Sequence, residues 1–380
     1  MYKRPSRIKD FLKRSDMFLL ITCILLTMFG IVAIASVTDG NMKNIIVQTG
    51  SMGIGIFMFV LFTVIDADKI ADKWLILIIF SAVFILGLLV LGKGDEVGSR
   101  AWYRFLGIGI QPSEIVKVIF IVLMANHIAG YREKGTLDQP KHVLDVILHF
   151  SIIFGLIFVV TNDLGSALIY AGIFIVMLVA GGIAWYWIGI GAAAVAAVIP
   201  IAWNHVFHEY QRQRILAPYD PTIDPNSEGI RWQTTRTMNA MKSGRLTGVG
   251  LGNGQLNIEA KHTDCIFASI GEEMGMVACI FVLLVLIVII IRCCVIGIRS
   301  NSYFGMLICF GVAASITFQT FINIGMCMGI SPVIGITLPF VSYGGSSIVA
   351  LFAAVGLVSG VKYRPKPQRH MMTGSIRIAK

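Results

Sequence analysis

One carboxylate stands where a long polar segment meets an apolar one. This is Asp264, in the run Lys261-His262-Thr263-Asp264. A carboxylate at the membrane surface could act as a general base on a membrane-bound substrate, or it could cap a helix that begins there. Glu272 follows two helical turns later, in Gly271-Glu272-Glu273. Two adjacent acids cannot both face lipid, so at least one of them should meet a polar partner or a cavity.

An acid and a base lie within a second apolar segment, in Gln111-Pro112-Ser113-Glu114 followed by Lys117. Glu114 and Lys117 are three residues apart, so they share one face of a helix. They could neutralise each other between packed helices, form the polar wall of a substrate cavity, or do both. Asp163, between two further apolar segments, could cap the second of them or pair with a cation in the same cavity.

Arginines gather in the polar segments near these acids. Arg100 and Arg104 precede the Glu114 segment, and Arg212 and Arg214 lie in the long polar segment before Asp264. Their guanidinium groups could bind a phosphate or diphosphate in bidentate fashion, or they could form the interfacial belt that many membrane proteins carry. The seven cysteines and seven histidines show no metal-ligand spacing, so the pattern predicts no dedicated metal site.

The composition decides what kind of protein must position these residues. The chain has 380 residues, of which 56% are hydrophobic and only 14% are charged. A soluble domain is about a quarter charged, so the composition excludes a soluble globular protein, a disordered chain and a disulfide scaffold. The net charge of +10 is better explained as an orientation signal than as a nucleic-acid surface, and we expect no nucleic acid partner.

Ten apolar segments predict an all-α polytopic membrane protein, because each is long enough to cross a bilayer as a helix. The segments are 17–36, 45–65, 74–92, 112–130, 142–160, 164–181, 184–203, 264–291, 303–324 and 343–361. They are expected to form a single membrane domain, 17–361, between basic tails at 1–16 and 362–380.

The distribution of Lys and Arg predicts that both termini are cytoplasmic. With that orientation 19 of the 31 basic residues lie inside, and the short outer loops carry only four. Seven more crowd one long extracellular loop, 204–263, between the seventh and eighth spans. Part of that loop, from Trp232 to Ser243, could form a helix along the membrane face.

Two Gly-rich runs flank the candidate site. The first, 244–254, lacks the G-x-G-x-x-G spacing of a nucleotide-binding loop, and its glycines would allow tight turns beneath a lipid headgroup. The second, 338–347, contains Ser342 and follows an apolar stretch, 326–337, that is too short to span twice. That stretch is either a re-entrant segment lining a cavity or an ordinary hairpin loop.

These runs, in this order on ten spans, resemble the SEDS family of bacterial cell-wall synthesis, which includes RodA, FtsW and SpoVE. The resemblance extends from the first span to Tyr363 and rests on Gln-Pro-Ser-Glu at 111–114 with Lys117, Asp-Leu-Gly-Ser-Ala at 163–167, Gly-Leu-Gly-Asn-Gly at 250–254, His-Thr-Asp at 262–264 with Gly-Glu-Glu at 271–273, and the run 338–347. The chain departs from the family at Asn162, where Pro often precedes the Asp, and at Ile258, where Leu-Pro-Glu is common.

The resemblance implies a peptidoglycan glycosyltransferase, a multi-pass protein of the bacterial cytoplasmic membrane. Such enzymes join lipid II units on the outer leaflet and release undecaprenyl diphosphate. A class B penicillin-binding protein is the implied partner, with other elongation or division machinery. No residue decides between elongation, division and sporulation. The family's essential Asp falls on Asp264, and its intramembrane acid–base pair falls on Glu114 and Lys117.

The implied reaction needs one base and one cationic clamp, because a diphosphate is already a good leaving group. We expect Asp264 to be the base and the four arginines to clamp the diphosphate with Lys117. The other expected substrate-site residues are Glu114, Asp163, Glu272 and Ser342. Asp264 could instead bind a divalent cation, Mg²⁺ or Mn²⁺, although the sequence requires no cofactor. The alternative function is a lipid II flippase, since a charged cavity with broken helices also fits transport.

Overall fold

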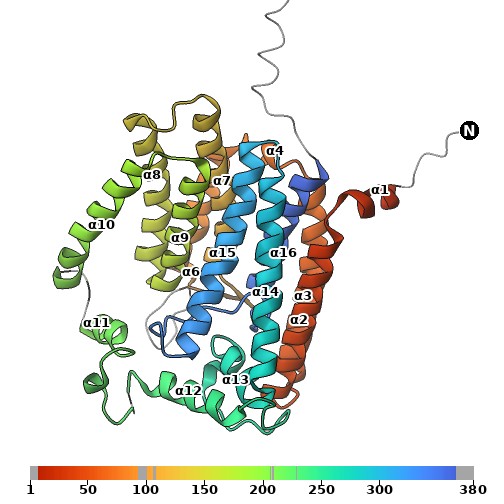
Figure 1. Ribbon diagram of the computed structural model, residues 1–380, viewed down its shortest axis with the longest axis vertical. Coiled ribbons are helices and arrows are strands. Elements are labelled where there is room, and N and C mark those ends of the chain that lie inside the picture. Colours follow the sequence, from red (N-terminus) through yellow and green to blue (C-terminus); the bar gives the residue numbers. More distant parts are fainter. Residues whose placement is uncertain are drawn as a thin grey trace, which may run out of the picture.

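The computed structural model describes residues 7–92, 101–105, 108–205, 207, 209–227 and 229–364. Within that part of the chain ten helical segments are long and apolar enough to cross a membrane, which confirms the predicted all-α polytopic fold (Figure 1). They are α2 (Met17–Val37), α3 (Met42–Val64), α5 (Trp74–Leu86) with α6 (Leu88–Leu91), α7 (Pro112–Glu133), α8 (Pro140–Leu156) with the π-helical η1 (Ile157–Thr161), α9 (Leu164–Gly181), α10 (Trp185–His205), α14 (Gly275–Ile298), α15 (Tyr303–Cys327) and α16 (Gly345–Tyr363).

Three of these helices form the centre of the bundle. In their most apolar stretches 72% of the residues of α7, 72% of α15 and 67% of α16 are buried. These apolar residues therefore face other helices and not the lipid. Helix α3 packs along α16 at very short range. A Cβ on Gly356 would lie 2.8 Å from the backbone of Phe59, so only glycine allows this approach.

The short elements lie at the two ends of the bundle. Helix α1 (Arg7–Arg14), α4 (Ala67–Ala71) and the end of α16 mark what we call the terminal end (Figure 1). The opposite end, called the loop end, carries α11 (Glu209–Leu216), α12 (Trp232–Gly244) and α13 (Ile266–Glu273), with the 3-10 turns η2 (Pro221–Ile223) and η3 (Glu259–His262). Helix α12 runs across this end, as the sequence predicted for Trp232 to Ser243.

A small antiparallel hairpin precedes α7, and the sequence analysis did not predict it. Its strands are β1 (Tyr103–Phe105) and β2 (Ile108–Ile110), and Tyr103 pairs with Ile110. The hydroxyl of Tyr103 donates to the carbonyl of Phe84 at 2.8 Å, which ties the hairpin to α5.

The predicted eighth span, 264–291, is wrong at its start. The chain breaks at Gly275, whose φ of 79° ends α13 and begins α14. A Cβ there would lie 2.3 Å from the carbonyl oxygen of Leu246, so the break depends on glycine and on the Gly-rich run packed against it. An apolar run does not reveal such a break. Asp264 therefore precedes a short helix at the loop end, and does not begin a spanning helix.

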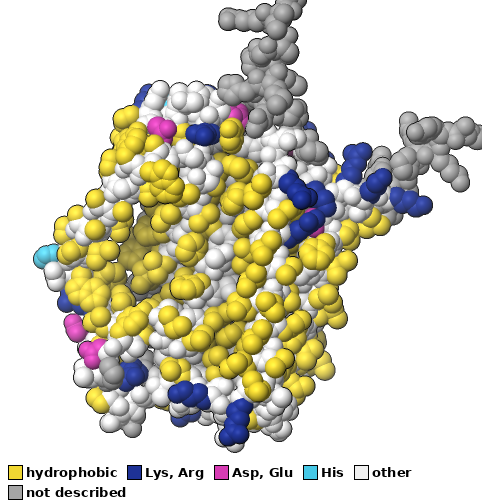
Figure 2. Space-filling model, viewed as in Figure 1, with side chains coloured by type: hydrophobic (Ala, Val, Ile, Leu, Met, Phe, Trp, Pro, Cys, Tyr) yellow, Lys and Arg dark blue, Asp and Glu magenta, His cyan; other side chains and the backbone are white. Residues whose placement is uncertain are grey.

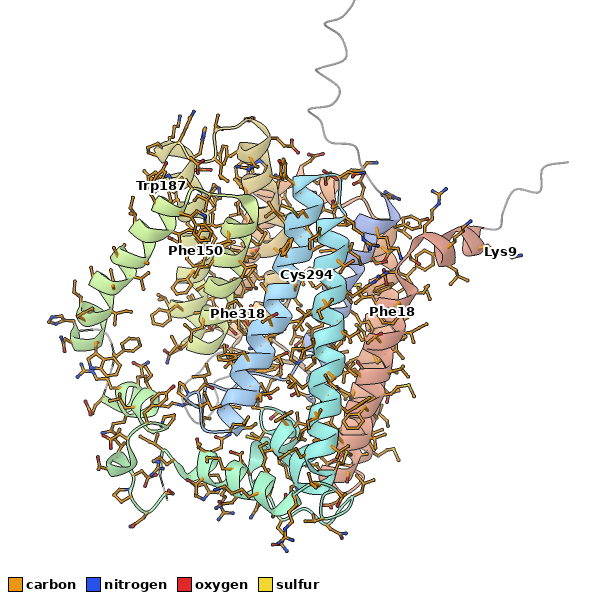
Figure 3. All side chains as sticks on the ribbon, in the orientation of Figure 1. Lys9, Phe18, Phe150, Trp187, Cys294 and Phe318 are labelled. Atoms are coloured by element: carbon orange, nitrogen blue, oxygen red, sulfur yellow. The ribbon has the colours of Figure 1, made fainter. Side chains whose placement is uncertain are left out.

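Helix α10 stands apart from the other spans. None of the residues in its most apolar stretch is buried, and Figure 2 shows a hollow between it and the rest of the apolar surface. It is tied at its terminal end, where Trp187 Nε1 donates to the carbonyl of Asp138 at 3.0 Å (Figure 3). The amide of Ala184 donates to the Asp138 carboxylate at 2.7 Å.

One buried carboxylate joins three helices at the terminal end. Asp16 caps α2 by accepting from the Leu19 amide at 2.9 Å. Arg292 of α14 contacts it at 2.6 Å and Lys362 of α16 at 3.0 Å. Burial raises the pKa of Asp16, but the hydrogen bonds from Arg292, Leu19 and Lys362 outweigh it and hold the pKa below its ordinary value.

The substitution Asp16→Asn tests this anchor, since it keeps the side-chain volume but leaves both cations without a counter-charge. We expect a lower melting temperature in detergent, corresponding to roughly 1–3 kcal/mol, because Arg292 and Lys362 remain partly exposed to solvent. Asp39→Asn, in an exposed turn, is the control and should melt like the wild type. Equal melting of the two variants would contradict the anchoring role.

Candidate active site

A cavity of about 570 Å³ opens at the loop end, which is a size typical of ligand sites. It is bounded by the hairpin before α7, the start of α9, helix α11, the segment before α13 and the non-helical segment after α15. Five of the predicted site residues line it: Arg104, Glu114, Asp163, Arg214 and Asp264. The structure therefore brings together residues that are up to 160 positions apart in the chain.

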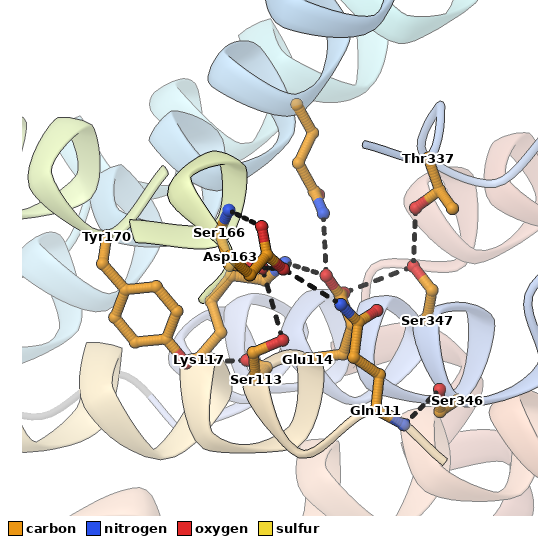
Figure 4. A network of polar contacts seen from close by, with 11 residues as sticks. Gln111, Ser113, Glu114, Lys117, Asp163, Ser166, Tyr170, Thr337, Ser346 and Ser347 are labelled. Carbon is orange, nitrogen blue, oxygen red and sulfur yellow. Dashed lines mark hydrogen bonds and ion pairs between the residues drawn. The ribbon is translucent and has the colours of Figure 1, made fainter. Parts of the chain in front are cut away.

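The floor of the cavity holds the predicted intramembrane ion pair, and Figure 4 shows its surroundings. Lys117 Nζ lies 2.8 Å from Glu114 Oε1, and both side chains are buried. Gln319 of α15 donates to the same oxygen at 3.2 Å, and Ser347 of α16 donates to Oε2 at 3.2 Å. The pair therefore joins helices, as the first alternative requires. Of its two members only Glu114 lines the cavity, so the second alternative holds for the acid and not for Lys117.

Asp163 fulfils the first of the two roles considered for it, the cap of the following helix. It caps α9 by accepting from the Ser166 amide at 2.9 Å and from the Ser166 hydroxyl at 2.6 Å. On the cavity side it accepts from the neutral side chain of Gln111, whose amide nitrogen lies 3.4 Å away, and not from the cation that the second role required (Figure 4). Desolvation raises the pKa of Asp163, and the hydrogen bonds from Ser166 work against that rise.

The backbone around Asp264 is held from two sides. Asn323 of α15 donates to the carbonyl oxygens of Asp264 at 2.7 Å and of Ile336 at 2.6 Å. Ser342 donates to the carbonyl of the preceding residue, Thr263, at 2.7 Å. Ser342 is thus a positioning residue in this structure. The Asp264 carboxylate faces Gly335, where a Cβ would lie 3.4 Å from Oδ2.

The segment after α15 fits the re-entrant alternative. Residues 328–344 form no helix, and several of them line the cavity. They are Pro332, Ile334, Gly335, Ile336, Thr337 and Tyr343. An apolar non-helical segment is tolerated at this depth because its carbonyl groups meet polar side chains such as Asn323.

Other predicted residues lie outside the cavity lining. Arg100 lies outside the described residues. Arg212 contacts Glu209 at 3.8 Å and the carbonyl of Asn204 at 3.2 Å. Glu272 accepts from the backbone amides of Gln255 and Leu256, at 2.9 and 3.1 Å, and so holds the Gly-rich run in place.

Three polar residues near the site were missed by the sequence analysis. Gln319 and Asn323 are four residues apart in a predominantly apolar span, and that spacing on one helix face was a usable signal. The sequence indicated His262 only as part of the His-Thr-Asp run, but this residue lines the cavity, and its ring lies 5.4 Å from that of Tyr343. Desolvation and the neighbouring Lys261 lower the pKa of His262, so its imidazole is neutral at pH 7.

The buried pair can be tested by its stability alone. Glu114→Gln leaves the Lys117 ammonium buried without a counter-charge, and we expect a loss of roughly 3–5 kcal/mol. The double variant Glu114→Gln/Lys117→Met removes both charges and should recover most of that loss. Melting of the purified proteins in detergent measures both effects, and a single variant as stable as the wild type would show that the pair does not hold the helices.

Comparison with known proteins identifies relatives along nearly the whole chain. It is 30% identical over 357 residues to the peptidoglycan glycosyltransferase MrdB of Escherichia coli (strain K12), covering 91% of this chain and 93% of that protein. It is 29% identical over 371 residues to a probable peptidoglycan glycosyltransferase FtsW of Geobacter sp. (strain M18), covering 92% and 97%.

Solved structures share the fold. One chain of a peptidoglycan synthase complex, studied for the structural coordination of polymerization and crosslinking, matches with a TM-score of 0.77 and 25% identity over 92% of this chain and 97% of that one. The rod-shape-determining protein RodA of Thermus thermophilus matches with a TM-score of 0.68 and 22% identity, over 92% and 96%. The family model for the FtsW, RodA and SpoVE cell cycle proteins matches residues 15–366. The chain therefore belongs to the FtsW/RodA/SpoVE family of cell cycle proteins.

Proposed function

We propose that this protein is a peptidoglycan glycosyltransferase that polymerises lipid II and releases undecaprenyl diphosphate. The observation that carries the proposal is the placement of the Asp264 carboxylate with Arg104 and Arg214 around one cavity at the membrane surface. The relatives MrdB and FtsW, which carry that activity in their names, cover more than nine tenths of the chain. Those relatives and the apolar spans make it a multi-pass protein of the bacterial cytoplasmic membrane.

In the proposed reaction the 4-hydroxyl of the acceptor GlcNAc attacks C1 of the donor MurNAc. The hydroxyl proton passes to the carboxylate of Asp264, and the bond from C1 to the diphosphate oxygen breaks with its electron pair on the diphosphate. A positioned base supplies about 10²–10⁴-fold in rate. Arg104 and Arg214 balance the charge that develops on the leaving group.

A divalent cation would fit this chemistry only together with the substrate. Asp264 supplies one carboxylate, and Mg²⁺ or Mn²⁺ is commonly held by one or two carboxylates plus substrate phosphates. Among the described residues, Asp264 belongs to no group of three side chains that could hold an ion without a ligand. Such an ion would help the arginines to neutralise the charge of the diphosphate. The proton of the acceptor hydroxyl would still need a base.

The proposed orientation places the loop end outside the cell and both termini in the cytoplasm. The Lys and Arg distribution supports it, as does the position of the cavity, because lipid II is joined on the outer leaflet. We also propose a class B penicillin-binding protein as partner. The support is the match to one chain of a synthase complex that coordinates polymerization and crosslinking. The elongation or division machinery would recruit that pair.

The base role predicts that Asp264→Asn abolishes polymerisation of purified lipid II in detergent, with a loss of at least about 100-fold, because the amide cannot accept the proton. Gel analysis of the glycan strands measures it. Asp39→Asn should retain full activity. Detergent removes any need for flipping, so wild-type polymerisation there also excludes a protein that only transports lipid II. Normal strands from the Asp264→Asn variant would refute the base role.

The position of Gly335 predicts a second loss of activity. Gly335→Ala places a methyl group 3.4 Å from Asp264 Oδ2, where the substrate hydroxyl must approach, at a φ of 68° that disfavours alanine. We expect polymerisation to fall roughly 10-fold or more, since small displacements at the reacting atoms are costly. Gly40→Ala has the same strain, at a φ of 72°, but no neighbour within 4 Å. Equal activity of the two variants would show that crowding at Asp264 does not matter.

A further inference from the structure

Three side chains with metal-binding atoms meet at the terminal end of α7 and α8, away from the cavity. His127 of α7, with Asp145 and His149 of α8, offers two ring nitrogens and a carboxylate oxygen that all lie within 4.8 Å of one another. Thirteen residues of α7 separate His127 from Glu114, which is about 20 Å along the helix. The cluster is therefore no part of the proposed polymerisation site.

The contacts of the two imidazoles favour a tautomer that leaves Nε2 free to bind a metal. Nδ1 of His127 lies 3.0 Å from the carbonyl oxygen of Leu123, and Nδ1 of His149 lies 2.8 Å from that of Asp145. A carbonyl oxygen only accepts, so both Nδ1 atoms carry the proton and both Nε2 atoms keep a lone pair. Metal-binding histidines almost always show this arrangement, with the second ring nitrogen donating to a carbonyl or carboxylate.

Asp145 is supported in the same way. Its Oδ2 accepts from the hydroxyl of Tyr131 at 2.7 Å, and its Oδ1 lies 3.6 Å from His149 Nδ1. Ligands around a tetrahedral Zn²⁺ lie about 3.3 Å apart, so side-chain rotation must close the group by somewhat more than 1 Å. None of the three residues is fully buried, which leaves room for that movement.

Neighbouring rings limit the movement to one side. Trp74 lies edge-on to both imidazoles, with ring centroids 5.7 Å from His127 and 6.1 Å from His149. The imidazole centroids are 4.2 Å apart. His127 is six residues, about 9 Å, from the end of α7, so the group lies nearer to the terminal end than to the cavity.

We propose that His127, Asp145 and His149 bind one Zn²⁺ ion, with water as the fourth ligand, and that this ion clips α7 to α8. Two imidazoles and one carboxylate are a donor set for zinc and other late first-row metals, and a poor one for Mg²⁺ or Ca²⁺. Helix α7 carries Glu114 and Lys117 at its other end. The clip therefore stabilises the helix that forms the floor of the cavity.

Zinc uptake by the full-length protein tests the proposal. The protein is purified in detergent with a tag that contains no histidine, stripped with a chelator and dialysed against Zn²⁺, and bound metal is measured by elemental analysis. The wild type should bind one equivalent of zinc more than His149→Ala does. The variants His127→Ala and Asp145→Asn should bind as little zinc as His149→Ala. All variants keep the seven cysteines, so any thiol-bound zinc is common to them.

The matched control is His142→Ala. His142 lies on the same end of α8 and stacks on Tyr131 at 4.1 Å, but it is outside the group of three. It should bind zinc like the wild type. Tyr131→Phe removes only the support of Asp145 and should weaken binding roughly 10- to 100-fold. Equal zinc uptake by the wild type and His149→Ala, or no uptake by either, would overturn the proposal.

A second variant covers the case in which the alanine variants fail to fold. His149→Cys places a thiolate at the site, and Co²⁺ bound there should show a sulfur-to-cobalt charge-transfer band that the wild type lacks. A folded His149→Cys protein without that band would overturn the proposal. Thermal melting with and without Zn²⁺ should show an upward shift in the wild type and in His142→Ala, and none in His127→Ala. Polymerisation is not needed for any of these measurements.

Discussion

The carboxylate of Glu114 is buried within the membrane part of the protein, and its neutralisation governs how the central helices pack. Moving a charge out of water costs several kcal/mol per ion, and the cost is offset only when the partner and the hydrogen bonds are both in place. Here Lys117 supplies the charge, while Gln319 and Ser347 supply hydrogen bonds from two other helices. Helices α7, α15 and α16 must therefore meet at one point, and the floor of the cavity is that point.

The same requirement extends to Asp264 through α15. Asn323 lies one turn beyond Gln319 and holds the backbone of Asp264, and also that of the non-helical segment at Ile336. One face of α15 thus positions a buried ion pair at one level and the proposed base at the next. A helix that shifted along its axis would break the contacts of both carboxylates together. The buried floor and the reactive wall of the cavity are consequently built as one unit.

Two kinds of feature could be predicted from the sequence: apolar spans, which repeat along the chain, and charged residues within them, which are energetically costly. A feature that depends on a single backbone angle could not be predicted. Ten apolar runs and the acids within or beside them were sufficient for the spans, the ion pair and the cavity. The break at Gly275 left no trace in hydrophobicity, so Asp264 was placed on a spanning helix when it lies before a short one. The role of Glu272 was also hidden, because its partners are the backbone amides of Gln255 and Leu256, just after the Gly-rich run.

The histidine cluster was missed for a related reason. No two histidines lie four residues apart on one helix. The residue four positions before His149 is an acid, Asp145. The remaining member comes from a different helix, and only the packing of α7 against α8 brings it near. Sites assembled within one helix face can be predicted from spacing, whereas sites shared between helices need the crossing geometry as well.

The two sides of the cavity differ in how firmly they are held, and this difference suits a polymerase. Asp264 is fixed through its backbone by Asn323 and, one residue earlier, by Ser342. Arg214 is carried by α11, which follows α10, the one span in the described part of the chain with no residue buried in its most apolar stretch. A base must keep its geometry through every cycle, because proton transfer tolerates little displacement. A diphosphate clamp must instead release its product after each bond is made, so a cation on a loosely packed element is better suited to that task than one on the rigid wall.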